Sequence, residues 1–296
     1  MRLHLMCWVG GLLLASESNG IEVETLQFLS ANGKDTLALD IYRPDSGAAY
    51  AGWGLFFLHG GGFSGGTRND AHSKAFAEAL AREGLTVVSL DYRLRQIGRG
   101  FHCDVPIADK REAIVWAAED LQAAIQTLES NFPQGIIVSG SSAGAEAALY
   151  GAYHQRIEGI KAVISIAGAM EPLVSFSAIP LLCFHGTCDN LVPFCEAIHH
   201  HCPENSDGAL MLWGGGALAA VHDQVELVAF RNAGHELANS LLTDPLAIET
   251  TIRFVQSIMD NRFTPSYQEI PSITPCTLNH SPAFPCEFQA CCSPSQ

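Results

Sequence analysis

Apolar runs and helical patterns alternate along most of the chain. Eight segments have the pattern of strands, namely residues 21–28, 35–44, 52–63 (a strand running into a glycine turn), 85–94, 135–140, 160–168, 179–186 and 225–234. Helices are predicted at residues 69–83, 107–128, 142–153 and 245–259. Strands that are apolar throughout and separated by helices form parallel sheets covered on both faces. The sequence therefore predicts an α/β fold with a doubly wound, mostly parallel sheet of eight strands and helices on both faces.

The two ends of the chain break this alternation. The first residues, MRLHLMCWVGGLLLASESNG, carry an arginine, an apolar stretch too short to span a bilayer, and small residues at Ser16 and Ser18. They predict a secretory signal peptide over 1–18, with a buried first strand or an uncleaved anchor as the alternative. Residues 263–296 are rich in Pro, Ser and Cys without periodicity, so we expect a disulfide-held or flexible tail outside the core. One catalytic domain, 19–262, lies between them.

Charge and cysteine content indicate which partners and which cellular compartment to expect for this domain. The formal net charge is -15, and a chain this acidic repels phosphate backbones, so nucleic acid is not an expected partner. Ten cysteines fit an oxidising compartment, which predicts a secreted or periplasmic protein. Cys183 lies in an apolar run and is expected to be a buried, inert thiol. Because Cys188, Cys195 and Cys202 share one short segment, we expect at least one disulfide among them. No other stretch predicts stable membrane insertion.

Two adjacent serines follow the strand at 135–140, in the sequence SGSSAGAEAALYG. A nucleophile on a sharp strand-to-helix turn needs small residues two before and two after it. Gly140 and Gly144 occupy these positions for Ser142, whereas Ser141 would have Ser139 and Ala143. The spacing predicts Ser142 as a nucleophile at the carboxyl end of a strand. Capping of the following helix is the alternative role for either serine.

A second glycine turn, HGGGF at residues 59–63, follows another buried strand. Hydrolysis by a serine creates an oxyanion that needs preorganised N–H donors, and glycines let the backbone approach the substrate closely. We expect the donors to be the N–H groups of Gly61, Gly62 and Ala143. The alternative is a turn that needs glycine only for positive φ.

The nucleophile also needs a base and an acid that orients the base. Asp189 follows the strand at 179–186, and His235 follows the strand at 225–234. The order Ser142, Asp189, His235 at three strand ends predicts a catalytic triad, with His235 as the base and Asp189 holding its tautomer. Taken singly, Asp189 could cap a helix and His235 could lie in a loop.

These motifs together resemble a known superfamily. The chain is similar to the α/β-hydrolases, specifically secreted serine esterases of the hormone-sensitive-lipase-like and feruloyl-esterase-like branches. The resemblance covers residues 21–261 and rests on HGGGF, SLDYRL, GSSAG, HGTCDNLVPF and AGHE. It implies an α/β-hydrolase fold, a carboxylesterase activity without cofactor, and structural roles for Asp91 and Arg93. The cysteine-rich Asp189 loop and the tail depart from the family pattern.

Connection lengths bear on the substrate. Only residues 169–178 separate two strands where lipases often carry a lid, and this is too short for a helical lid. We therefore expect an open site without a large lid or cap, with 95–106 as one wall. Such a site suits short-acyl or plant-type (acetyl, feruloyl) esters, either small molecules or linked to polysaccharide. The three histidines at 199–201 match no zinc pattern, so we expect a solvated loop rather than a metal site.

Two other functions are open at this point. A serine peptidase of the prolyl-oligopeptidase type shares the triad order, but usually carries an N-terminal propeller or an anchor for the substrate amine. A non-catalytic binding protein with this fold typically lacks a triad member. Neither feature is found in the sequence, which favours the esterase.

Overall fold

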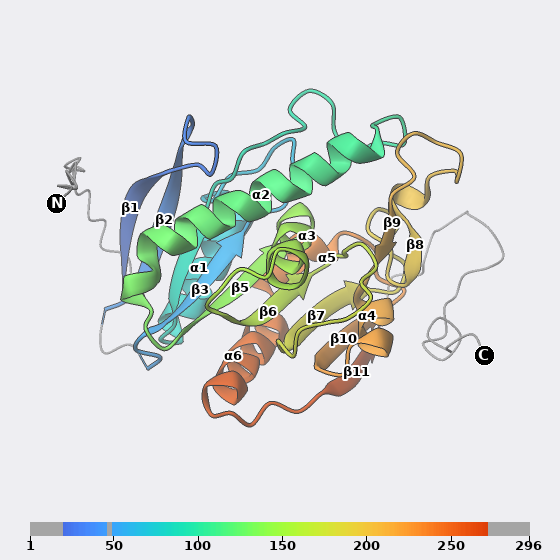
Figure 1. The fold of residues 1–296 in the computed structure, drawn as a ribbon. Coiled ribbons are helices and arrows are strands. Elements are labelled where there is room, and N and C mark those ends of the chain that lie inside the picture. Colours follow the sequence, from blue (N-terminus) through green and yellow to red (C-terminus); the bar gives the residue numbers. More distant parts are fainter. Residues whose placement is uncertain (1–19, 46–48, 272–296) are drawn as a thin grey trace.

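The computed structural model describes residues 20–45 and 49–271. A sheet runs through the centre of this part in the order β1-β2-β4-β3-β5-β6-β7-β10-β11 (Figure 1). Its strands are β1 (Ile21–Leu29), β2 (Thr36–Pro44), β3 (Trp53–Leu58), β4 (Thr86–Leu90), β5 (Gly135–Ser141), β6 (Ile160–Ile166), β7 (Leu181–Gly186), β10 (Val225–Arg231) and β11 (Ser266–Pro271). Only the β1–β2 and β2–β4 pairings in this sheet are antiparallel. The predicted mostly parallel α/β sheet is confirmed.

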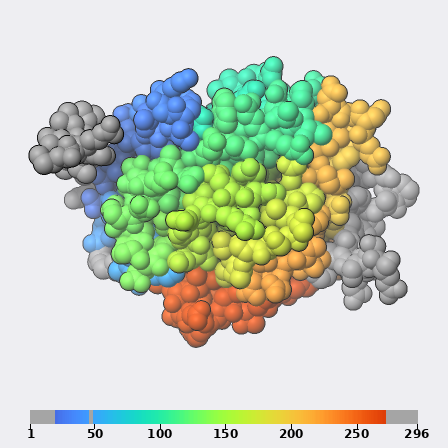
Figure 2. All heavy atoms as spheres, viewed as in Figure 1, coloured from blue at the N-terminus to red at the C-terminus, as the bar shows by residue number. Residues whose placement is uncertain are grey.

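Helices pack on both faces of this sheet because successive strand residues point to opposite sides. In β3, Phe56 belongs to the core cluster shared with α2 and α3, whereas Phe57 belongs to the cluster shared with α1 and α6. These helices are α1 (Ala71–Arg82), α2 (Ile107–Leu128), α3 (Ala143–Leu149) and α6 (Pro245–Met259). In the ribbon view, α2 lies across the sheet on the face in view, and with all atoms drawn its residues are on the surface of that face (Figure 1 and Figure 2). The sheet therefore lies between two hydrophobic cores, as its apolar strands led us to expect.

The ends of the long helices follow local sequence signals. The helix expected at 107–128 has these bounds, with Ile114, Leu121 and Ile125 buried along one stripe. Asp244 accepts hydrogen bonds from two backbone N–H groups at the start of α6, and Pro245 follows it. The helix predicted at 142–153 divides into α3 and a π-helical turn at Tyr150–His154. No helix among the described residues is long and apolar enough to cross a bilayer.

The sheet has nine strands in the described part of the chain, so the prediction of eight was wrong. The additional strand, β11, lies in the segment expected to be a tail outside the core. It pairs in parallel with β10 at the edge of the sheet, and Glu269 forms an ion pair with Arg231. An edge strand held by backbone hydrogen bonds can expose most of its side chains, and β11 does. Its sequence therefore lacks the apolar run that identified the other strands.

The connection between β7 and β10 also has structure that the sequence analysis missed. A short antiparallel pair, β8 (Glu196–Ile198) with β9 (Met211–Trp213), is followed by α4 (Gly215–Val221). Each strand of the pair has three residues, too few to show an alternating pattern. The connection between β6 and β7 contains no helix, as its length predicted.

A buried ion pair ties α2 to the antiparallel end of the sheet. Asp120 on α2 is fully buried and accepts hydrogen bonds from the Nε and backbone N–H of Arg93 and from the backbone N–H of Ala31. Arg93 also reaches Glu119, whose side chain is 41% exposed. Asp91 forms an ion pair of 2.7 Å with Arg68. These contacts agree with the structural roles that the resemblance implies for Asp91 and Arg93.

We expect Asp120→Ala to lower the free energy of unfolding by about 3–5 kcal/mol, because it leaves the Arg93 guanidinium buried without its main partner. Glu119→Ala is the matched control, since it removes the exposed partner of the same arginine and should cost less than about 1 kcal/mol. Urea denaturation of the two variants measures the difference. Equal losses of unfolding free energy in the two variants would contradict the assignment of Asp120 as the main partner of Arg93.

Candidate active site

Ser142 lies on a strained turn between β5 and α3. Its backbone has φ 50° and ψ −121°, a conformation that L residues rarely adopt. A Cβ at Gly140 would lie 2.2 Å from the carbonyl carbon of Gly144, and a Cβ at Gly144 would lie 2.1 Å from the Leu58 oxygen. Both contacts are impossible for real atoms. The two glycines are therefore required for this turn to close against β3, which is the physical reason for the spacing around Ser142.

The neighbouring serine has a different environment. The Ser141 side chain is buried, and its hydroxyl donates a hydrogen bond to the carbonyl oxygen of Ala238 in α5 (Leu237–Ser240). The Ser142 hydroxyl instead lies 2.9 Å from His235 Nε2. The structure thus brings Ser142, and not Ser141, to the predicted base.

The third predicted residue completes this arrangement. His235 Nδ1 lies 2.8 Å from Asp189 Oδ2, so the chain Ser142–His235–Asp189 is continuous. Asp189 follows β7 and His235 follows β10, which are adjacent parallel strands. A Cβ at Gly186 would lie 2.3 Å from the Ala233 oxygen, so glycine lets the two loops meet. The three side chains come from three strand ends on the same edge of the sheet.

Asp189 is fully buried and extensively hydrogen-bonded. Its Oδ1 accepts hydrogen bonds from the backbone N–H groups of Leu191 and Val192, both at 2.9 Å. Burial alone would raise its pKa, but the contacts with His185 and His235 outweigh burial and hold the pKa of Asp189 below its usual range. The carboxylate is therefore ionised at neutral pH, as an acid that orients an imidazole must be.

His185 is a supporting residue whose part the sequence analysis missed. Its Nδ1 accepts a hydrogen bond from the backbone N–H of Gly215, which leaves the proton on Nε2. That Nε2 lies 3.1 Å from the Val192 oxygen and 3.5 Å from Asp189 Oδ2. The second histidine thus contacts the same carboxylate oxygen as His235. Its position at the end of a strand, four residues before Asp189, was the available signal.

The three residues predicted as oxyanion donors lie around the same cavity as Ser142. Gly61 and Gly62 follow β3 with φ of 118° and 59°, and together with Ala143 they line the same cavity as Ser142. Behind the turn, the His59 ring stacks on Tyr92 at 4.4 Å, and the Tyr92 hydroxyl donates to the His59 oxygen. His59 therefore belongs to the support of the turn, as expected.

The cavity over Ser142 has a volume of about 400 Å³. One wall is formed by residues 100–102, which confirms the expectation for 95–106. A second wall, which was not predicted, comes from Leu191, Val192, His199 and His200 in the long β7–β10 connection. The two loops lie far apart in the sequence, and they meet where the Phe101 ring packs against His199.

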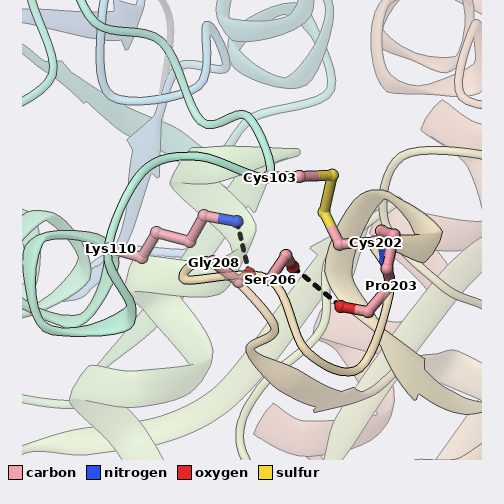
Figure 3. The surroundings of a disulfide bond; sticks show 6 residues. All are labelled: Cys103, Lys110, Cys202, Pro203, Ser206 and Gly208. Atoms are coloured by element: carbon pink, nitrogen blue, oxygen red, sulfur yellow. Dashed lines mark hydrogen bonds between the residues drawn. A yellow bond between two sulfur atoms is a disulfide. The ribbon is translucent and has the colours of Figure 1, made fainter.

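A disulfide joins these two walls (Figure 3). Cys103 is bonded to Cys202, 99 positions away in the sequence. Beside it, Lys110 Nζ donates to the Gly208 oxygen, and the Gly208 N–H donates to the Cys103 oxygen. We expected at least one disulfide among Cys188, Cys195 and Cys202, but Cys202 pairs outside this group, because the fold lays the two loops against each other.

Two other cysteines, Cys188 and Cys183, differ from each other in their bonding. Cys188 is also disulfide-bonded. Cys183 is a buried thiol, as predicted, and burial raises its pKa well above the ordinary value. An unreactive thiol is the consequence, because the thiolate is the reactive form.

The histidine run does not form the solvated loop that the sequence predicted. His199 is buried, and its ring packs edge-on against Phe101 at 4.9 Å and stacks on His200 at 4.2 Å. Its Nε2 lies 3.5 Å from Oε1 of Glu146, itself buried on α3. Three polar residues in a row gave no signal of burial, because the enclosing wall comes from another part of the chain. Within the described residues, no group of three His, Cys, Asp or Glu side chains could hold a metal ion.

The strand order, the positive-φ serine after β5 and the order of Ser142, Asp189 and His235 are those of the α/β-hydrolase fold. A model of the BD-FAE family matches residues 39–172, which include the glycine turn after β3 and the Ser142 turn. The chain is also similar to gut esterase 1 of Caenorhabditis elegans, with 30% identity over 125 residues that make up 40% of this chain and 21% of the relative. The match thus spans about a fifth of that relative's length.

Solved structures agree on the fold. The chain is similar to XC6422 from Xanthomonas campestris, described as an α/β serine hydrolase without lid, with a TM-score of 0.52 and 20% identity over 78% of this chain and 94% of that chain. It is also similar to TT1662 from Thermus thermophilus, with a TM-score of 0.54 and 17% identity over 80% of this chain and 98% of that chain.

We expect Cys103→Ala to lower the free energy of unfolding by about 2–5 kcal/mol, because it removes the cross-link between the two walls. Cys202→Ala should have the same effect, and the double variant should lose no more than either single variant. Chemical denaturation measures all three, and mass mapping without reductant identifies the linked peptides. Additive losses, or a peptide joining Cys202 to Cys195, would contradict this pairing.

Proposed function

We propose that this protein is a serine carboxylic-ester hydrolase. The observation that carries the proposal is the continuous contact from Asp189 through His235 to the Ser142 hydroxyl, at 2.8 and 2.9 Å. Ser142 is the nucleophile, His235 is the general base, and the ionised Asp189 fixes the tautomer of His235 and stabilises the imidazolium.

The reaction proceeds through an acyl-enzyme. As His235 Nε2 takes the hydroxyl proton, Ser142 Oγ bonds to the ester carbonyl carbon, and the carbonyl oxygen becomes an oxyanion facing the N–H groups of Gly61, Gly62 and Ala143. The C–O bond to the alcohol then breaks, and His235 returns the proton to the leaving alcohol. Water, deprotonated by His235, then attacks the acyl carbon. The bond from that carbon to Ser142 Oγ breaks as His235 returns the proton to Oγ, and the acid is released.

The cavity favours short or compact acyl groups. It is an open groove of about 400 Å³, and the β6–β7 connection carries no helix that could close over it. The Xanthomonas relative in fold is likewise described as lacking a lid. Acetyl, other short-acyl and aromatic acyl esters, including feruloyl esters linked to polysaccharide, are the candidate substrates.

Export is part of the same proposal. Ten cysteines and the Cys103–Cys202 disulfide suit a secreted or periplasmic protein. The signal-peptide pattern at 1–18 and most of the Pro/Ser/Cys-rich segment lie outside the described residues.

Ser142→Ala should lower kcat/KM for 4-nitrophenyl acetate by roughly 10⁴-fold or more, since the nucleophile is lost. His235→Ala should cost about as much because the triad acts as a unit, and Asp189→Asn should cost less. Ser141→Ala is the matched control, because its hydroxyl bonds the Ala238 carbonyl and takes no part in the triad. A fluorophosphonate probe should label Ser142, and labelling of Ser141 would overturn the assignment.

Activity should peak between acetyl and butyryl esters, or at aromatic acyl esters, and fall for palmitoyl esters. Each buried methylene contributes about 0.8 kcal/mol only when it leaves water fully, and an open groove does not provide this. Because no lid has to open over the groove, no jump in rate should accompany the formation of tributyrin droplets. Initial rates on a 4-nitrophenyl ester series and on tributyrin across its solubility limit measure both. A preference for palmitate over butyrate would refute the proposed groove.

A further inference from the structure

A pair of buried polar side chains lies in the catalytic cavity without a part in the triad mechanism. Glu146 is one helical turn after Ser142, and its backbone N–H donates a hydrogen bond to the backbone carbonyl oxygen of Ser142. Its side chain is 2% exposed, and that of His199 on the opposite wall is 4% exposed. Both residues line the cavity that contains Ser142 and His235. Their contact, Oε1 to Nε2 at 3.5 Å, joins the helix of the nucleophile to the wall held by the disulfide.

The environment keeps both members of this pair uncharged at neutral pH. Burial raises the pKa of Glu146 to about 8, although His235 after β10 and Lys110 on α2 partly oppose it, and the charge of Asp189 after β7 adds to it. Burial, reinforced by Lys110, lowers the pKa of His199 to about 3. The pair is thus a protonated carboxyl beside a neutral imidazole. A neutral pair favours a neutral ligand group over an ammonium or a carboxylate.

The hydrogen-bonding capacity of this pair is only partly used. Glu146 Oε2 and His199 Nδ1 have no hydrogen-bond partner among the described residues, although both atoms are buried. Buried polar groups in folded proteins are normally paired, so orphaned atoms at a cavity wall point to a ligand. Placing the imidazole proton on Nε2, the nitrogen 3.5 Å from Glu146 Oε1, leaves Nδ1 as an acceptor, and the protonated carboxyl offers a donor. A hydroxyl group suits either atom, because it can accept a hydrogen bond from the carboxyl or donate one to Nδ1.

We propose that Glu146 and His199 bind a hydroxyl group of the ester substrate and so select hydroxylated esters over their deoxygenated analogues. This inference rests on the proposed esterase function and adds a substrate class to it. The aromatic ring of Phe101 packs against His199 and shields the pair, so that a substrate without the hydroxyl would leave two buried polar atoms unpaired.

Two matched pairs of esters test the proposal and distinguish the part of the substrate that carries the hydroxyl. On the acyl side, 4-nitrophenyl 3-hydroxybutyrate is compared with 4-nitrophenyl butyrate. On the alcohol side, 2,3-dihydroxypropyl butyrate is compared with propyl butyrate by titration of the released acid. In one of the two arms, kcat/KM for the hydroxylated ester should exceed that of its partner by about tenfold or more.

Three variants connect this preference to the pair. Glu146→Met keeps the length of the side chain and His199→Phe keeps an aromatic ring, but each removes the polar atoms. In each variant the ratio of kcat/KM between the hydroxylated ester and its partner should therefore fall to near one. Glu146→Gln offers a donor and an acceptor like the protonated carboxyl and should retain the preference. Leu191→Ala, on an apolar part of the same cavity, is the control that should change both esters of a pair by the same factor.

The outcomes separate this inference from the proposed function. If neither ester of any pair is hydrolysed, the esterase function itself is wrong. If all esters are hydrolysed and both ratios are near one in the natural protein, the function stands and hydroxyl recognition is refuted. A preference that persists in Glu146→Met and His199→Phe would also refute it. Thermal unfolding of each variant confirms that it is folded, and if Glu146→Met does not fold, His199→Phe and Glu146→Gln decide the question.

Discussion

The proposed active site depends on backbone segments that approach each other more closely than any side chain would allow. Cβ atoms at Gly140, Gly144 and Gly186 would lie 2.1–2.3 Å from backbone atoms of neighbouring turns. The first two glycines let the Ser142 turn close against β3, and the third lets the loop of Asp189 meet the loop of His235. Replacing any of these glycines would push the strand ends apart. The contacts of the proposed triad, at 2.8 and 2.9 Å, would then be longer than hydrogen-bond distance.

Electrostatics adds a second constraint at the same place. Asp189 is ionised although it is fully buried, because two backbone N–H groups and two imidazoles surround it. Since its folded pKa lies below its value in the unfolded chain, the ionised carboxylate contributes stability that is fully present above about pH 4 and is lost as the pH falls further. Glu146 lies in the same cavity and behaves in the opposite way, because it has no such donors and burial decides its state. Two buried carboxyls near one serine thus have different charges at neutral pH.

Local patterns in the sequence predicted the frame of the molecule and singled out the three residues that lie together in the proposed triad. The helix at 107–128 is visible because its apolar stripe repeats over many turns, and Ser142, Asp189 and His235 are visible because each follows a buried strand. The features that the sequence did not predict arise from contacts between distant segments. The edge strand β11 needs only the backbone of β10, Cys202 meets Cys103 only in the fold, and His199 is buried by a wall from elsewhere in the chain.

This division between predictable and unpredictable features has a consequence for substrate choice. The proposed triad stands on strand ends, which the sheet fixes, so the same chemistry is available to many proteins with this fold. The walls of the cavity come instead from the β4–α2 and β7–β10 connections, and the Cys103–Cys202 disulfide holds these two loops in one position. A wall fixed in this way can present buried polar atoms such as His199 Nδ1 at a constant distance from Ser142. In the proposed esterase, specificity therefore has its physical origin in the two loops and their cross-link, and the proposed reaction has its origin in the sheet.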